Sequence, residues 1–278
     1  MQDFVHLHVH TQYSILDGQA SVSRLVDKAM KDGMRGMAIT DHGNMMAIKE
    51  FFNYTNKVKG KAKDALSKAQ EKLQGLKDGT YCPNKENDAE NGLSTEELIA
   101  ATEKEIAKQS KIVQFKPIFG CEMYVARRGN KKLKERKEDQ SGWHLIVLAK
   151  NEKGYHNLIK LVSSAWTDGF YMRPRTDHAD LAKYREGLIV CSACIGGEIP
   201  QKIIHEDFDA AENAARWFKE TFGDDFYLEL QRHKVTDPNI IANREAYPLE
   251  QKSNKGLIEL SKKLNIKIIC SNDTHFVD

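Results

Sequence analysis

Apolar and polar residues alternate along the first stretch of the chain, residues 4–10 (FVHLHVH). Because strand side chains alternate with period two, the two valines and the leucine would face a core, while His6, His8 and His10 would share the opposite face. Imidazole is a good ligand for zinc, iron, nickel or copper. The pattern therefore favours a metal site on a strand over exposed histidines or an artificial tag.

The rest of the pattern predicts strands that alternate with helices. Apolar runs predict further strands at residues 34–40, 116–125, 143–149, 187–192, 226–231 and 266–271. Apolar residues at helical spacing predict helices at residues 20–32, 44–59, 151–166, 208–222 and 249–264. Residues 170–180, which contain Pro174, are expected to be irregular. Alternation of this kind predicts a mainly parallel sheet, and seven strands suit a closed barrel. We predict an α/β fold, a distorted seven-stranded (β/α)7 TIM-like barrel.

One segment, at about residues 60–112, differs in composition from the rest. It begins with a highly charged stretch, continues through the turn-rich residues 82–92 and restarts as a helix behind a capping-box-like Ser94 or Thr95. We interpret it as a helical insertion, a hairpin between two core elements of one domain that spans residues 1–278. Its basic helix could touch DNA, although a solvated charged face is the simpler interpretation.

Composition narrows the class of protein. The chain has 278 residues, 40% of them hydrophobic, and a net charge of +2 from 42 basic and 40 acidic residues. This balance gives no global attraction to nucleic acid, so DNA binding would need a local basic patch. No apolar stretch approaches the roughly 20 residues of a membrane span, and the N-terminus has no secretion signal. Five cysteines suit a reducing compartment, so we expect a cytoplasmic protein. Cys121, Cys191 and Cys270 are expected in the core.

Candidate metal ligands gather at the C-terminal ends of the predicted strands, where α/β barrels build their active sites. His144 begins its strand, but an antiparallel return after Glu122 would carry it to the same end. Taken singly, His42 could cap a helix, Glu122 could pair with a lysine and Cys194 could be a core thiol. Their convergence favours metal binding. The candidate ligands are His8, His10, Asp17, His42, Glu122, His144, Cys194, Asp273 and His275.

So many ligands of mixed type exceed the needs of one tetrahedral zinc ion. They predict two or three divalent ions, zinc first, with manganese, iron or magnesium as alternatives. Metal pairs about 3.5–4 Å apart clamp phosphate esters and activate water. The chain has neither a P-loop nor a GxSxG elbow. Arg173 and Arg175, in FYMRPRTD, could bind phosphate or DNA, or could be solvated loop arginines.

Several motifs together resemble those of the PHP (polymerase and histidinol phosphatase) superfamily, and within it the N-terminal domains of bacterial replicative DNA polymerase III alpha subunits. These motifs are FVHLHVHTQYSILDG, GMAITDHGNM, PIFGCEMYV, WHLIVLAKNEKGYHNL, FYMRPRTD, LIVCSACIGGEIP and CSNDTHFVD. The resemblance implies a distorted seven-stranded barrel with a polynuclear metal centre. It carries the metal-ligand role to all nine candidates by motif. It says nothing about the segment at 60–112.

The resemblance leaves three functions open. The first is a metal-dependent phosphoesterase that proofreads DNA as a 3′–5′ exonuclease. The second is a structural domain that supports the polymerase and docks a separate proofreading subunit. The third, a small-molecule phosphatase, is disfavoured by the polymerase-like motifs. The implied partners are DNA, the remainder of a polymerase chain and other replisome subunits, with no membrane. Palm, thumb and fingers would follow this domain, and without them it should not polymerise DNA.

Overall fold

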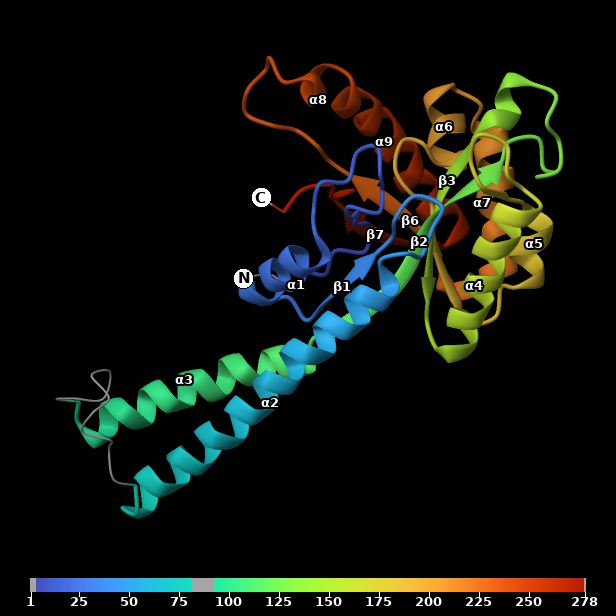
Figure 1. The fold of residues 1–278 in the computed structure, drawn as a ribbon. Helices are drawn as coiled ribbons and strands as arrows, with labels where there is room; N and C mark the ends of the chain where they lie inside the picture. The colour runs from blue at the N-terminus through green and yellow to red at the C-terminus, as the bar shows by residue number, and fades with distance from the viewer. Residues whose placement is uncertain (1–3, 82–92, 278) are drawn as a thin grey trace. The chain divides into compact units, whose positions relative to one another are not determined.

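The computed structural model describes residues 4–81 and 93–277 (Figure 1). The chain divides into two compact units. The first comprises Met1–Val5, Leu25–Met37 and Lys49–Pro117, and the second comprises His6–Arg24, Ala38–Ile48 and Ile118–Asp278. The turn-rich residues 82–92 of the predicted insertion lie outside the described residues.

Two long helices dominate the first unit, α2 (Ile48–Asp78) and α3 (Thr95–Gln114). The shorter helix α1 (Val22–Lys31) precedes both in the chain. The helix predicted to end at residue 59 is longer than expected, because α2 continues without interruption through the charged stretch. The α3 helix begins at the expected capping box, in which Ser94 and Glu97 each bond the other's backbone N–H. Helices α2 and α3 run side by side (Figure 1). That this segment is an insertion stays a prediction.

Seven strands form one curled sheet, in the order β1-β2-β3-β5-β6-β7 with β4 beside β2. They are β1 (Gly36–Ile39), β2 (Lys116–Ala126), β3 (Gly142–Ala149), β4 (Arg175–Thr176), β5 (Leu188–Cys191), β6 (Phe226–Gln231) and β7 (Lys267–Ser271). Strand β3 is antiparallel to both neighbours, β2 and β5, whereas β5, β6 and β7 are parallel. The prediction of a distorted α/β barrel is confirmed, and so is the antiparallel return that carries His144 back to the end of the sheet where Glu122 lies.

The expected N-terminal strand is not a regular strand, which corrects the prediction for residues 4–10. Only isolated bridges form there, one of them parallel between Val9 and Thr274. The Val9 N–H donates to the Thr40 hydroxyl at 2.8 Å instead of to a ladder carbonyl, so a continuous ladder cannot form. The Val9 carbonyl still accepts from the Thr40 N–H at 2.9 Å. The segment therefore joins the two edges of the curled sheet.

Helices cover the outer face of this sheet (Figure 1). They are α4 (Glu152–Thr167), α5 (His178–Lys183), α6 (Glu198–Ile204), α7 (Phe208–Phe222) and α9 (Ala246–Leu264). The short helix α8 (Ile241–Arg244) contacts α9 instead. Alternate residues of the strands pack against them in the main core, and the intervening residues fill the inside of the curl. Val147, Leu161 and Phe218 belong to the outer core, while Ile146 and Leu148 belong to the inner one.

Three local expectations need correction. The region predicted to be irregular, residues 170–180, contains β4 and the start of α5. The short helix α6 follows β5 almost directly and was not predicted. Cys121 and Cys191 are buried as expected, but Cys270 is exposed. In the described part of the chain, no helix has the length and apolar character needed to cross a bilayer.

Arg175 has a structural task and not the predicted phosphate contact. Its side chain is fully buried. The Nε group donates to the Gly169 carbonyl at 3.0 Å, and Nη2 donates to the carbonyls of Lys131 and Leu133 at 2.6 and 3.0 Å. These bonds join the loop after β2 to the loop after α4. Because the guanidinium is enclosed, it cannot reach a phosphate in solution.

We expect Arg175→Ala to lower the free energy of unfolding by about 3 kcal/mol, because three backbone carbonyls, two of them on buried residues, lose a charged donor. Arg173→Ala is the matched control. Arg173 is partly exposed, and its loss should change the free energy by less than about 0.5 kcal/mol. Urea unfolding followed by circular dichroism measures both. Equal effects of the two substitutions would contradict the structural role of Arg175.

Candidate metal centre

Side chains from seven separate segments meet at one end of the curled sheet. Eight of the nine predicted ligands fall into three groups, and within each group one donor atom per residue lies within 4.8 Å of the others. The groups are His10, His42 and His275; His8, His10 and Asp273; and Glu122, His144 and Cys194. They join residues more than 260 positions apart in the sequence, because the N-terminal segment lies beside the end of β7.

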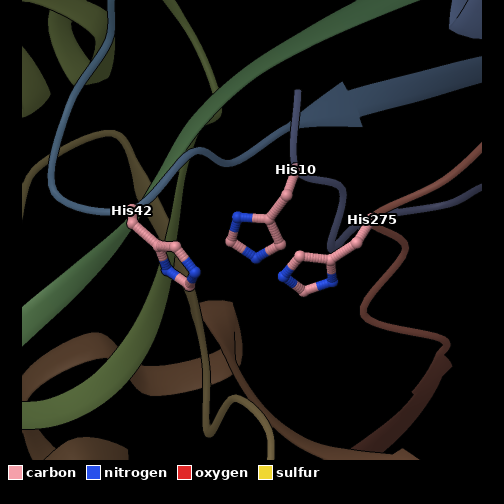
Figure 2. A group of neighbouring side chains, drawn as sticks. All are labelled: His10, His42 and His275. Carbon is pink, nitrogen blue, oxygen red and sulfur yellow. The ribbon is translucent and has the colours of Figure 1, made fainter. Parts of the chain in front are cut away.

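The first group is a set of three imidazoles (Figure 2). The ring centroid of His10 lies 4.1 Å from that of His42 and 4.3 Å from that of His275. Asp17, the ninth predicted ligand, borders this group, with Oδ2 3.2 Å from His42 Nε2 and 3.9 Å from His275 Nε2. The geometry therefore brings all nine candidates to one place.

Glu122 lies at the centre of the cluster. Its Oε1 is 2.7 Å from His144 Nδ1 and 3.4 Å from His8 Nε2. Its Oε2 contacts His42 Nδ1 and lies 3.6 Å from His10 Nε2. A carboxylate with imidazoles on both oxygens could serve as a metal ligand together with those imidazoles. The backbone fixes this position, because Glu122 N–H lies 3.2 and 3.1 Å from the carbonyls of the two residues before His42.

Cys194 supplies sulfur at the edge of the cluster. Its Sγ lies 3.6 Å from His144 Nδ1 and 3.9 Å from Glu122 Oε1, and it accepts the Gly196 N–H at 3.4 Å. Glycine at position 196 avoids a tight contact, since a Cβ there would lie 3.0 Å from His144 Nδ1. The preceding residue, Ala193, has a left-handed backbone with φ 62°. A tight turn after β5 thus aims the thiol at the cluster.

An outer layer of polar residues orients His8. Glu229, on β6, accepts the His8 Nδ1–H at 2.8 Å. Gln231 donates to the same carboxylate at 2.9 Å, and the Ser271 hydroxyl also contacts it. With Nδ1 protonated, His8 turns Nε2 toward the cluster. Sequence reasoning missed Glu229, although an acidic residue inside a buried strand was a usable signal.

A second chain of hydrogen bonds orients His10. Its Nδ1 lies 2.9 Å from the Ser14 hydroxyl, which donates to Asp41 at 2.8 Å. Asp41 also accepts the backbone N–H of Thr11 at 2.7 Å and its hydroxyl at 2.9 Å. The Ser14 hydroxyl can therefore accept a hydrogen bond from His10 Nδ1–H. His10 Nε2 is then unprotonated, and it is the nitrogen that faces the cluster and could ligate a metal ion.

Several buried polar atoms inside the cluster lie against one another without hydrogen bonds of regular geometry. They include His8 Nε2, His10 Nε2, His42 Nδ1, Glu122 Oε2 and Asp273 Oδ1. Buried polar atoms without well-formed hydrogen bonds are costly and rare. These five all belong to the three groups, so the donor set fits divalent cations. Their grouping supports a metal centre beyond what residue types alone could show.

The carboxylates and imidazoles of the cluster shift one another's pKa values toward the charged forms. Burial would raise the pKa of Glu122, but His144, His42 and His8 hold it well below its usual range. Burial lowers the pKa of His42, yet the hydrogen bond and charge of Glu122, followed by those of Asp17, raise it to about 9. His42 therefore carries a proton at neutral pH when no cation is bound. A metal ion at His42 would displace that proton.

The cluster forms the floor of a cavity of about 670 Å³. Asp17, His42, His144, Asp273 and His275 line it. Above them stand apolar and aromatic side chains, together with Arg173. Of the two predicted phosphate-binding arginines, Arg173 thus lies at the cavity, whereas Arg175 lies in the buried position described above. The cavity brings a cation-binding floor and a guanidinium within reach of one small molecule or chain end.

Known proteins with similar sequences bear out the resemblance. DNA polymerase III subunit alpha of Borreliella burgdorferi is 36% identical over 275 residues, which cover 99% of this chain and 18% of that protein. The same subunit of Aquifex aeolicus is 32% identical over 282 residues, 100% of this chain and 18% of its own. The chain thus spans about a fifth of the length of these relatives.

A solved structure named as a candidate metal-dependent phosphoesterase, from Bifidobacterium adolescentis, aligns with a TM-score of 0.44 at 13% identity, over 99% of this chain and 89% of that one. The PHP domain model matches residues 6–233, which carry the first seven of the nine candidate ligands. The chain belongs to the PHP domain family.

Proposed function

We propose that this chain is a metal-dependent phosphoesterase that removes nucleotides from the 3′ end of DNA as a proofreading exonuclease. The observation that carries the proposal is the convergence of three donor groups on the floor of an open cavity. The relatives named DNA polymerase III subunit alpha support DNA as the substrate. We further propose that the domain works in a replicative polymerase in the cytoplasm, with the remaining polymerase domains and other replisome subunits as partners.

The donor set supports two or three divalent ions. Imidazole and thiolate donors favour zinc, while the carboxylates would also accept manganese, iron or magnesium. His8, His10 and Asp273 would hold one ion and Glu122, His144 and Cys194 another, with His10, His42 and His275 at a third place. His10 belongs to two of these groups, and Glu122 contacts imidazoles of all three, so the groups share ligands.

When bound, such ions supply hydroxide from water near neutral pH and neutralise the charge of a phosphate. The residues of the chain would position the reaction. Glu229 and Ser14 keep His8 and His10 in the tautomer that presents Nε2. Arg173, at the cavity wall, would donate to the non-bridging oxygens of a phosphodiester.

The openness of the site favours catalysis over a purely structural role. Structural metal sites close all positions with protein ligands, whereas catalytic sites keep a position open to solvent or substrate. Here Asp17 is half exposed, and His42, His144 and His275 each keep about a fifth to a quarter of their side chains accessible. Asp273 also keeps about a fifth of its side chain accessible, whereas His8, His10 and Glu122 are buried. The cluster is therefore enclosed on one side and accessible from the cavity.

The first prediction concerns metal content and cleavage. Elemental analysis of the purified protein should find two or three divalent ions, and a labelled oligonucleotide should be shortened from its 3′ end. His8→Ala should lower that rate by about 100-fold or more, because it removes one ligand of a metal site. His156→Ala is the control, since His156 is an exposed histidine on α4 outside the cluster. Chelation should abolish cleavage, and the metal should restore it.

A cleavage rate that His8→Ala leaves unchanged would assign the activity to a contaminant. Bound metal without any cleavage would instead favour the structural role. In that case the metal should raise the melting temperature, because it binds the native state alone, while proofreading would be left to a separate subunit docked on the domain.

The second prediction concerns the outer layer. Glu229→Gln should weaken metal binding by about 10- to 100-fold, because the amide no longer accepts the His8 proton as strongly. Glu198→Gln is the matched control, for Glu198 is also a largely buried carboxylate paired with a histidine, His178, at 3.1 Å. Titration against a fluorescent metal chelator gives both affinities. Equal losses in the two variants would show that Glu229 acts through general stability alone.

A further inference from the structure

A group of exposed apolar side chains, here called the collar, lines the metal cavity. Ile15, Leu16, Met172, Trp166 and Phe170 are 83, 77, 65, 44 and 43% exposed, and all of them line the cavity. Exposed apolar side chains gathered in one place mark binding sites more often than chance. The collar therefore belongs to recognition, and its chemistry differs from that of the polar floor.

Two aromatic rings of this collar stack on each other. The rings of Trp166 and Phe170 lie with centroids 5.4 Å apart and planes at 13°. The Trp166 indole N–H donates to the Gly43 carbonyl at 2.8 Å, which fixes the ring. Gly43 directly follows the candidate ligand His42. The indole is thus tied to the same turn that carries the metal-binding imidazole.

The backbone beside the rings is also strained. Met172, two residues after Phe170, has φ 63°, a left-handed conformation that residues with a Cβ seldom adopt. Such outliers persist where the surrounding structure imposes them, and they concentrate at functional sites. The bend turns the loop toward Arg173 and Pro174, which line the cavity as well.

We infer that Trp166 and Phe170 form a platform on which the terminal base of a DNA strand stacks, while its phosphodiester faces the candidate metal ligands and Arg173. This inference rests on the proposed function and specifies its substrate. Base–aromatic stacking tolerates every base, since each has a flat π-face. A base on the platform cannot also pair, so the site selects unpaired ends. A mismatched end frays most readily and would therefore be preferred.

A docking segment of another protein would also cover apolar side chains, but it fits the mouth less well. The same cavity holds Arg173 and the acidic and imidazole side chains of its floor. A strand end satisfies both halves, since it carries a flat apolar base and an anionic phosphate. An apolar peptide would leave the floor without a partner. Charge complementarity therefore favours the nucleotide.

The test pairs two substrates with three forms of the full chain. The substrates are single-stranded oligonucleotides that are identical except that one lacks its 3′-terminal base. Wild-type protein, supplied with divalent metal and no deoxynucleoside triphosphates, should cleave the complete end about 10-fold faster or more. Trp166→Ala should remove most of that preference. Phe208→Ala is the control, because Phe208 is an aromatic residue with 51% exposure, against 44% for Trp166, and is not among the residues that line the cavity.

A wild-type enzyme that cleaves both substrates at the same rate overturns the platform but leaves the phosphoesterase intact. If neither substrate is cleaved, the proposed function fails, and fluorescence anisotropy still tests the platform by binding. Tighter binding of the complete end that Trp166→Ala abolishes supports stacking. Equal affinities overturn it. Trp166→Ala could instead leave the cleavage and binding preferences unchanged and abolish binding of another polymerase subunit. That result would show that the collar binds a protein and not a DNA end.

Discussion

The contacts of Glu122 with four imidazoles are the interaction on which the site depends. A carboxylate that is 1% exposed is stable as an anion only where cations compensate it, and the surrounding histidines supply that compensation. Divalent ions would do so more strongly, with the imidazoles as neutral ligands. Removal of Glu122 would leave Asp273 and Asp17 as the remaining carboxylates against the imidazoles of His8, His10 and His42. Glu122 therefore balances the charge of the imidazoles, and the packing of this end of the barrel depends on that balance.

The topology of the sheet follows from the need to bring these groups together. The antiparallel turn from β2 into β3 pairs Glu122 with Ile146, which leaves His144 two residues away on the same face. The bridge between Val9 and Thr274 does the same for the two ends of the chain, because it sets His8 and His10 beside Asp273 and His275. Both departures from a regular parallel barrel lie at the metal cluster, so the distortion has a local chemical reason.

Sequence reasoning located the cluster because polar residues interrupt the apolar pattern at the ends of several strands. The topology of the sheet brings these strand ends together. Sequence reasoning could not distinguish Arg173 from Arg175. The two arginines are two residues apart in a loop expected to be irregular, and their spacing does not tell which side chain is buried and which lines the cavity. The regular strand expected at residues 4–10 failed for a similar reason, because the Thr40 hydroxyl replaces a ladder partner and only tertiary contacts reveal it. Glu229 acts through His8 and belongs to no motif, so its only signal in the sequence is an acidic residue within a buried strand.

The distribution of burial through the site argues for a reaction at its surface. His8, His10 and Glu122 are enclosed and held by an outer layer, which fixes their geometry before any substrate arrives. Asp17 and His275 lie toward the cavity, where they meet solvent. A centre built only to stabilise the fold would gain nothing from that opening, because exposed ligands are solvated by water and bind cations less tightly. The opening is useful only if a ligand enters the cavity. The apolar collar favours a ligand with an aromatic part, and Arg173 and the metal-binding floor favour one with an anionic part.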